Sequence, residues 1–211
     1  MDIAKTANQA LKEAIIKRKS TRLYDTSRNI EANTLECILQ AALQAPSPKN
    51  RQPWNFTVVT DKEHRAELSQ ILNNKLQQLK ELRNKEKVAC DDLDLANGSV
   101  RAIKTAPVVV FVEYVCDINN EHGDEHDWCI AARPFEVADL QSIGASIQNM
   151  LLEATIAGVS SLWMCDVLYA VPELSDYLKL EHTLIAAVAL GYEAVRSTPR
   201  FGINEKVRYF E

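Results

Sequence analysis

The chain lacks several features that would assign it to a specialised class of protein. It has no excess of positive charge, because 24 lysines and arginines stand against 29 aspartates and glutamates. A nucleic-acid-binding domain would show a basic surface, so this balance argues against one. No apolar run approaches the length of a membrane span, and the N-terminus shows no signal-peptide core. The five cysteines are odd in number and include no Cys-x-x-Cys pair, as expected of reduced thiols in a cytosolic protein.

Internal repeats, low-complexity tracts and a Gly-x-Gly-x-x-Gly nucleotide-binding fingerprint are absent as well. Hydrophobic residues make up 46% of the chain and charged residues 25%, which are ordinary values for a globular domain. A chain of 211 residues can bury a sizeable core as one unit. We therefore expect a single cytoplasmic domain over residues 1–211, with neither nucleic acid nor a membrane among its partners.

A loop over residues 45–56 contains three prolines. Its sequence is Ala-Pro-Ser-Pro-Lys-Asn-Arg-Gln-Pro-Trp-Asn-Phe. Each proline fixes its own φ and biases the residue before it toward extended geometry. The loop therefore presents Ser47, Asn50 and Gln52 with little conformational entropy left to lose. Amide side chains carry both donors and acceptors, which suits a flat heterocycle that needs both along one edge. A simple proline-stiffened connector between a helix and a strand is the alternative.

A basic cluster follows the first segment with helical spacing. Apolar residues recur at that spacing over about residues 4–17, and the cluster Lys17-Arg18-Lys19-Ser20-Thr21-Arg22 comes next. Guanidinium groups bind oxyanions through two parallel hydrogen bonds, and hydroxyls add further donors. The cluster therefore suits a single phosphate group. Solvated charges that complement a helix C-terminus are the alternative.

The other elements follow from the spacing of apolar residues. Residues 135–158 carry the longest helical stripe, with small residues at 144–146 where another helix can approach and Gly158 as a C-terminal cap. Continuous apolar runs, typical of strands buried on both faces, occupy residues 105–114 and 184–190. By the same criteria we expect helices over residues 35–45 and 62–87, a strand over 56–60 and a loop over 90–99.

Taken together, these motifs resemble the nitroreductase family. The loop matches every fixed position of that family's flavin-ring loop, roughly Ala-Pro-Ser-x-x-Asn-x-Gln-Pro-Trp-x-Phe. The basic cluster resembles the family's opening Arg-Arg/Lys-Ser-x-Arg-x-Phe/Tyr, with Tyr24 in the aromatic position. The pattern that starts at Asp139, Asp-x-x-x-x-Gly-Ala-x-x-Gln-Asn-Met-Leu-Leu-x-Ala, resembles the family's central helix, and residues 159–165 resemble the turn after it. The resemblance extends from Ala14 to Phe210.

The resemblance implies an α+β, nitroreductase-like fold, with a central mixed or antiparallel sheet flanked by helices, in an intertwined homodimer. It implies FMN as the cofactor, bound at the dimer interface, with the ring contacted partly by the second subunit. It assigns Arg18, Lys19, Ser20, Arg22 and Arg200 to the phosphate and ribityl chain, Pro46, Ser47, Asn50 and Gln52 to the ring, and Trp163, Met164 and Cys165 to the face that carries N5. Cys165-Asp166 stand where Gly or Glu-Gly is common in the family, so the amide that reaches N5 stays open.

The resemblance also implies an enzyme. Hydride would pass from NADH or NADPH through the flavin to a nitroaromatic, a quinone or a related small acceptor in a ping-pong cycle, with no acid–base triad. Family members often build a substrate lid from the region that corresponds to residues 62–105. The C-terminal segment 207–210 is expected to pair with the partner subunit, because a lone tail strand has little stability. Neither the acceptor nor the preferred nicotinamide follows from the sequence.

Three alternatives stay open beside this interpretation. Residues 122–126 fit His-x-x-Glu-His, a zinc-hydrolase motif, although Asn119, Asn120 and Gly123 favour a turn over the helix that such a site needs. A second alternative is a non-catalytic, FMN-binding or sensory protein. The third is one of the family's specialised activities, reductive dehalogenation or flavin fragmentation.

Overall fold

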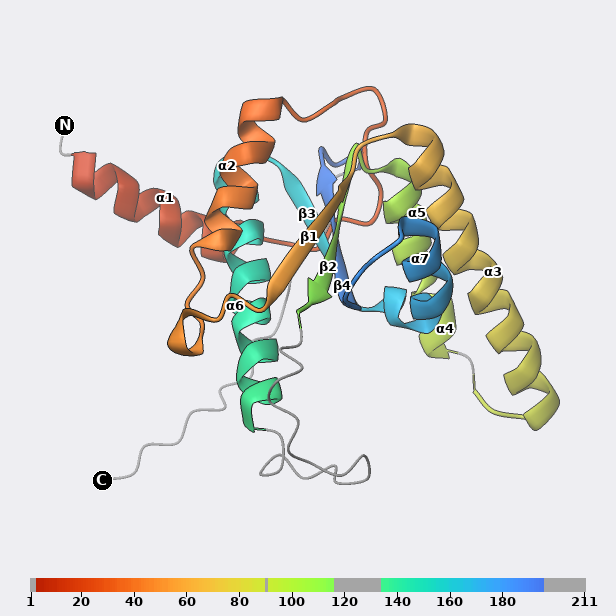
Figure 1. Cartoon of the computed structure of the whole chain (residues 1–211). Helices are drawn as coiled ribbons and strands as arrows, with labels where there is room; N and C mark the ends of the chain where they lie inside the picture. Colours follow the sequence, from red (N-terminus) through yellow and green to blue (C-terminus); the bar gives the residue numbers. More distant parts are fainter. Residues whose placement is uncertain (1–2, 90, 116–133, 196–211) are drawn as a thin grey trace, which may run out of the picture.

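The computed structural model describes residues 3–89, 91–115 and 134–195. Its centre is a four-stranded antiparallel sheet in the order β1-β2-β4-β3 (Figure 1). The strands are β1 (Trp54–Val59), β2 (Val108–Tyr114), β3 (Ser160–Met164) and β4 (Thr183–Gly191). Within the described part of the chain, β1 and β3 are therefore the two edge strands.

The two central strands are the apolar runs that the sequence predicts as buried. Residues 108–112 of β2 are at most 3% exposed, and residues 186–190 of β4 are at most 2% exposed. The β-branched Val110 and Val188 lie opposite each other in the register, and side chains of this shape pack well across strands. Because helices cover both faces of these strands, their sequences are continuously apolar instead of alternating.

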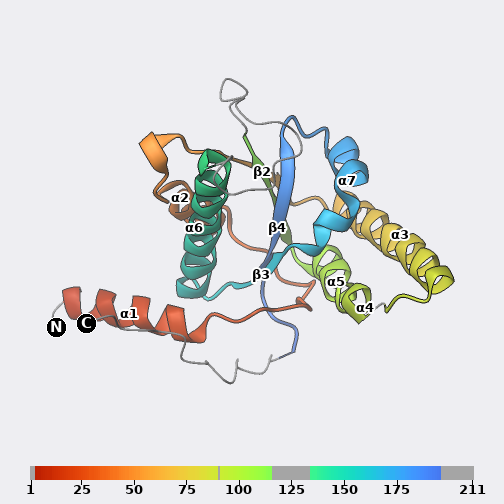
Figure 2. The same ribbon diagram turned by 90° about the horizontal axis from the view of Figure 1, so that it is seen from below.

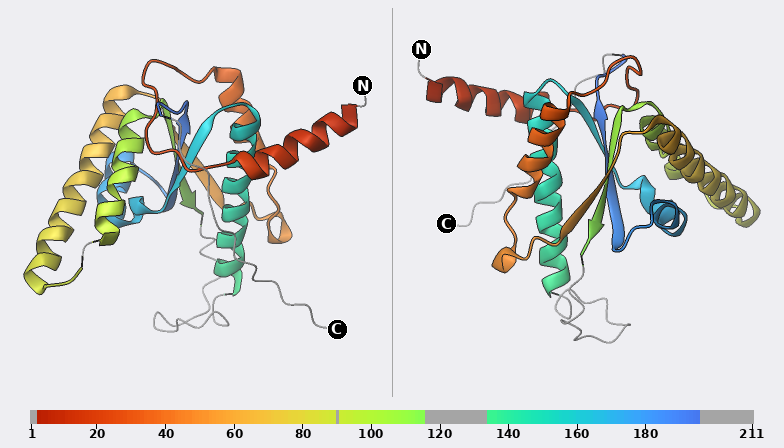
Figure 3. Two further views of the ribbon diagram at one scale, coloured as in Figure 1. Left: turned by 180° about the vertical axis from the view of Figure 1, so that it is seen from behind. Right: turned by 45° about the horizontal axis from the view of Figure 1, so that its top comes forward.

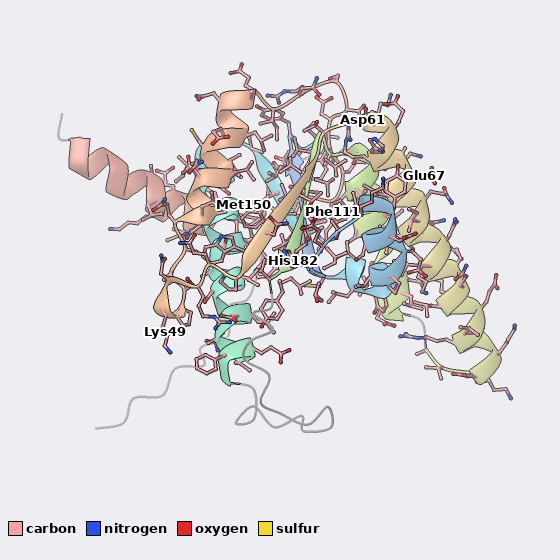
Figure 4. The ribbon with its side chains drawn as sticks, in the orientation of Figure 1. Lys49, Asp61, Glu67, Phe111, Met150 and His182 are labelled. Carbon is pink, nitrogen blue, oxygen red and sulfur yellow. The ribbon has the colours of Figure 1, made fainter. Side chains whose placement is uncertain are left out.

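Helices cover both faces of the sheet (Figures 1 and 3). α2 (Ala32–Leu43) and α6 (Pro134–Ile156) lie on one face, while α3 (Lys62–Glu86), α5 (Asn97–Thr105) and α7 (Val171–Leu178) lie on the other. Each face has its own core. The buried residues Met150 and Phe111 belong to the first and the second core respectively (Figure 4). The predicted α+β fold is confirmed.

α1 (Ile3–Lys17) projects away from this body and meets it at α6 (Figure 1). The predicted helices over residues 4–17, 35–45, 62–87 and 135–158 correspond to α1, α2, α3 and α6. Gly158 follows α6 with a φ of 71°, as expected of a C-terminal cap. None of the described helices combines the length and the hydropathy needed to cross a membrane.

The small residues of α6 allow the close helix contact that the sequence predicts. The Ser146 hydroxyl donates a hydrogen bond to the Ala42 carbonyl of α2 at 2.8 Å. The Asn149 side-chain amide donates to the neighbouring Ala41 carbonyl at 3.2 Å. Side chains of α6 thus reach the backbone of α2 directly, and the two helices form one layer over the sheet.

Two stretches differ from the prediction. Residues 90–99, expected to be a loop, contain α4 (Asp91–Leu95) and the first residues of α5. Leu93 and Ala96 are fully buried there, so a few apolar side chains anchor this otherwise polar stretch to the core. Residues 159–165, expected to be a turn, contain β3, because the edge of β4 supplies backbone hydrogen-bond partners for them.

The region where the resemblance places a substrate lid is part of the fold's core. Its fully buried side chains are Leu68, Leu72, Leu76, Leu93, Ala96, Ala102 and Ile103. Farther along α3, Leu82 is 54% exposed, and this end of the helix extends beyond the sheet (Figure 1). A lid within residues 62–105 stays a prediction. The end of α3 around Leu82 is the part of this region that does not pack into the core.

We expect Gly191→Ala to destabilise the fold and Gly144→Ala to be tolerated. A Cβ atom on Gly191 would lie 2.4 Å from Pro107 Cδ and 2.9 Å from Tyr24 Cδ1. Forcing an extra carbon into a packed site costs about 1–3 kcal/mol. A Cβ on Gly144 would lie 3.7 Å from Trp163, an ordinary contact, and alanine is favoured over glycine inside a helix by about 1 kcal/mol. Urea unfolding followed by circular dichroism measures both, and equal midpoints for the two variants would contradict this packing.

Candidate functional site

The basic segment, residues 18–22, leaves α1 as extended chain beside the edge strand β3. The Thr21 N–H donates to the Ser161 carbonyl at 3.0 Å, and Ser20 pairs with Ser161 in a parallel bridge. A few residues later, the Asp25 N–H donates to the Tyr192 carbonyl at 2.8 Å, just after β4. The sheet therefore holds the segment in place. Solvated charges that only complement a helix end would not require these hydrogen bonds.

Two arginines of the segment are available to a ligand. In the described part of the chain, the guanidinium groups of Arg18 and Arg22 have no hydrogen bond or ion pair. Lys19, in contrast, lies 2.8 Å from the Glu193 carboxylate. The Thr21 hydroxyl is buried and has no hydrogen-bond partner there either, which is rare for a buried polar group. An oxyanion would supply the partners that these groups lack.

The three predicted site residues at the end of β3 differ in their exposure and in the face of the sheet that they occupy. Trp163 is 39% exposed and lies beside Gly144 of α6. The Met164 side chain is 1% exposed and points into the core on the other face of the sheet. Cys165 is exposed. A ligand at this strand end can therefore contact the side chains of Trp163 and Cys165, but only the backbone of Met164.

The Arg22 side chain lies beside α5, and α5 in turn contacts the residue that follows Cys165. The Arg22 Cδ lies 2.8 Å from the position that a Cβ on Gly98 would take, so a side chain at residue 98 would displace it. The next residue, Ser99, donates a hydrogen bond to the Asp166 carboxylate, which directly follows Cys165. We call residues 18–22 and 163–165 the β3 half-site, because both groups lie along that strand.

The second half-site is the loop over residues 46–52, which leads into β1. Lys49, Asn50 and Gln52 have φ values of 53°, 55° and 49°. This left-handed region costs a residue with a side chain roughly 1–2 kcal/mol. The Gln52 N–H donates to Ser47 Oγ at 2.9 Å, and the Gln52 side-chain amide donates to Asn50 Oδ1 at 3.0 Å. Strain of this kind clusters at functional sites.

We call this loop the β1 half-site, and the structure does not bring it against the β3 half-site. β1 and β3 are separated by two strands, or about 14 Å at the usual spacing of about 4.8 Å. Figure 2 shows the loop and the end of α1 on different sides of α6. Arg200, the remaining predicted phosphate ligand, lies outside the described residues.

The zinc-hydrolase alternative rests on a motif outside the part of the chain that the structure describes. Residues 122–126 lie outside the described residues. Among the described ones, no group of three or more His, Cys, Asp or Glu side chains is placed to hold a metal ion.

Comparison with known proteins identifies the class. The model of the nitroreductase family matches residues 15–192, so the chain belongs to that family. A proposed NADH dehydrogenase/NAD(P)H nitroreductase of Archaeoglobus fulgidus is 28% identical over 150 residues, which span 71% of this chain and 64% of that protein. The chain therefore spans less than two thirds of this relative's length.

Two solved structures share the fold. A BluB-like flavoprotein from Clostridium difficile 630 superposes with a TM-score of 0.75 and 26% identity, over 95% of this chain and 98% of that one. A nitroreductase with bound FMN from Desulfitobacterium hafniense superposes with a TM-score of 0.73 and 21% identity, over 96% and 98%. The nitroreductase-like fold expected from the sequence motifs is thus confirmed.

One group that the sequence analysis missed is an ion pair between Arg51 and Asp139. The Arg51 Nε and Nη2 atoms donate to the two Asp139 carboxylate oxygens at 3.2 and 2.9 Å. Arg51 occupies a variable position of the loop motif, so the resemblance did not single it out. An available signal was Asp139 itself, a charged residue within the apolar stripe of a predicted core helix.

We expect Cys165 to react slowly with alkylating reagents. Although Cys165 as a whole is exposed, partial burial of its thiol, with a smaller contribution from the Asp166 carboxylate, raises the thiol pKa. Because the thiolate is the reactive form, its alkylation by iodoacetamide should rise at higher pH than that of a free cysteine, whose pKa is about 8.5. Asp166→Asn removes the charge but keeps an acceptor for Ser99, so it should move the curve to lower pH. Peptide mass spectrometry resolves this site, and a curve at or below that of free cysteine would contradict the assignment.

Proposed function

We propose that this protein is an FMN-dependent oxidoreductase that moves hydride from NADH or NADPH to a small acceptor, such as a nitroaromatic compound or a quinone. The observation that carries the proposal is the hydrogen-bonded contact between the basic segment and β3. It puts the segment that carries Arg18 and Arg22 beside a strand that includes Trp163 and is followed directly by Cys165. A ligand with an anionic tail and a flat ring fits such an edge, and FMN is one.

The residues of the β3 half-site fit the phosphate end of this cofactor. Arg18 and Arg22 would bind the phosphate, with the Ser20 hydroxyl as a further donor. Lys19 would share its charge between the phosphate and Glu193, which already lies 2.8 Å away. Arg200 joins this set on the resemblance alone. The buried, unpartnered Thr21 hydroxyl supports a ligand at this place.

The β1 half-site fits the ring. The hydrogen bond between the Gln52 and Asn50 side chains leaves the Asn50 amide as a donor and the Gln52 carbonyl as an acceptor. Ser47 accepts from the Gln52 N–H, so its own hydroxyl proton is free to donate. When bound, FMN would supply the redox chemistry, taking hydride from NAD(P)H and passing it to the acceptor in a ping-pong cycle. The protein would bind and orient the ring.

We further propose that the complete site forms between two copies of the chain. The strand order supports this, because it holds the two half-sites at opposite edges of one sheet. The apolar side of α1 supports it as well, since Leu11 and Ile15 are 47% and 58% exposed on a helix that projects from the body. An exposed apolar surface of this kind usually marks an interface. A homodimer would cover it and supply the second half-site.

The alternatives predict different behaviour in solution. A non-catalytic FMN protein would keep the cofactor but not turn over. The family's specialised activities, reductive dehalogenation and flavin fragmentation, would require their own substrates or consume the flavin. A cytoplasmic location remains an expectation from the reduced cysteines and belongs to the same proposal.

The experiment that tests the function is steady-state oxidation of NADH and NADPH by the purified protein. We expect flavin absorbance bands near about 370 and 450 nm, and oxidation that depends on an added quinone or nitroaromatic, because the flavin carries the reaction. A yellow protein without turnover would support the non-catalytic alternative. A colourless protein that cannot be loaded with FMN would overturn the proposal.

Replacing Arg18 or Arg22 with alanine should weaken FMN binding. Each change removes a charge-assisted hydrogen bond worth roughly 1.5–3 kcal/mol, or about 10- to 150-fold in affinity. Arg28→Ala is the matched control, because its guanidinium instead lies 3.5 Å from the centre of the Tyr192 ring. FMN titration followed by fluorescence measures all three. If Arg18→Ala and Arg22→Ala bind FMN as tightly as Arg28→Ala does, the phosphate assignment is wrong.

A further inference from the structure

The strained loop of the β1 half-site needs a restraint that its own hydrogen bonds do not supply. Its internal bonds join Asn50 and Gln52 to Ser47 and to each other. All of them lie within the loop, so they fix its shape but not its place on the protein. Lys49, Asn50 and Gln52 each have a positive φ, and such a conformation persists only where the surroundings over-determine it. The restraint must come from outside the loop.

Arg51 supplies a contact with another element. It lies between the two left-handed residues Asn50 and Gln52, with an ordinary φ of −67°, and its side chain reaches α6. There the guanidinium group forms a two-point ion pair with Asp139, with donor–acceptor distances of 3.2 and 2.9 Å. Planar two-point pairs of this kind fix orientation as well as distance.

The carboxylate that receives Arg51 is buried. The Asp139 side chain is 1% exposed and that of Arg51 is 19% exposed. The Tyr114 hydroxyl lies 3.5 Å from the same carboxylate, at the end of β2. Phe135, one turn earlier on α6, lies beneath both loop cations, with ring-centre distances of 5.4 Å to Lys49 Nζ and 5.7 Å to the Arg51 guanidinium. Because removing a partner from a buried charge is costly, the Asp139 carboxylate leaves the Arg51 guanidinium little freedom to move.

We propose that Arg51 and Asp139 are positioning residues, which hold the loop so that Asn50 and Gln52 present their amides to the flavin ring. This inference rests on the proposed function for the identity of the ring. The pair acts through the loop, because the guanidinium anchors residue 51 to α6 and residue 51 lies directly between the left-handed residues Asn50 and Gln52.

Losing the pair should alter how the ring is held more than whether FMN binds. The proposed phosphate ligands Arg18 and Arg22 belong to the other edge of the sheet and are unchanged, so FMN affinity should fall by no more than about fivefold. Misplacing a reacting group by about 1 Å can slow its reaction by about 100-fold. We therefore expect kcat to fall by about 10-fold or more, the KM for NAD(P)H to stay within about threefold, and the flavin absorbance bands to shift.

The test uses Asp139→Asn and Arg51→Lys in the full-length protein. Asparagine keeps the shape of the side chain but not its charge, and a lysine ammonium cannot make the two parallel bonds. The first readout is hydrogen exchange at the backbone amides of Asn50, Arg51 and Gln52, measured with and without added FMN. Exchange should be about 10-fold faster in both variants, because opening of the loop exposes these amides. The flavin absorbance spectrum, kcat and the KM for NAD(P)H of both variants are then measured.

Lys75→Met is the matched control, because it breaks the ion pair with Glu173 between α3 and α7, on the other face of the sheet. It should leave loop exchange, the spectrum and kcat unchanged, even where it lowers the melting temperature as much as the test variants do. If Asp139→Asn does not fold, Arg51→Lys decides the matter, since its side chain is partly exposed.

Unchanged exchange in the loop would overturn the inference, and so would faster exchange with an unaltered spectrum and kcat. A wild-type protein that binds no FMN would instead overturn the proposed function, while the exchange measurement would still show whether the pair holds the loop.

Discussion

The strand order β1-β2-β4-β3 is the constraint on which the rest of this protein depends. Antiparallel pairing puts the two most apolar strands in the centre and leaves β1 and β3 as the described edges. Each edge then receives one group of polar residues, the loop before β1 and the basic segment beside β3. The two groups lie at opposite edges of one sheet, and the proposed site joins them through a second copy of the chain.

Both half-sites are held in place by contacts within the protein. The basic segment is hydrogen-bonded to Ser161, and the loop is held by internal hydrogen bonds and by the pair between Arg51 and Asp139. Ordering side chains during binding costs free energy, so groups that are already fixed bind more tightly and with better-defined geometry. The chemistry of the proposed reaction belongs to the cofactor, and the chain's contribution is the rigid placement of donors, acceptors and positive charge.

The sequence predicts the parts of this structure that local patterns determine. The runs at residues 105–114 and 184–190 indicate buried strands because both of their faces are covered. The sequence predicts a turn where β3 lies, because this strand is short and starts with Ser160 and Ser161. Its strand geometry comes from pairing with β4, which no local pattern reveals. The loop residues could be identified because their spacing is fixed within one segment. The contacts of Arg51 with Asp139 and of Ser99 with Asp166 join residues far apart in the chain, and no local pattern specifies such pairs.

The claim that one cofactor site draws on two copies of the chain is tested most directly by subunit complementation. Differently tagged copies carrying Arg22→Ala or Gln52→Ala are produced together and purified as the mixed dimer. A site shared between subunits predicts one intact site in that dimer, with about half of the wild-type NAD(P)H oxidation, while each singly changed homodimer has little activity. A mixed dimer no better than the two homodimers would contradict the account.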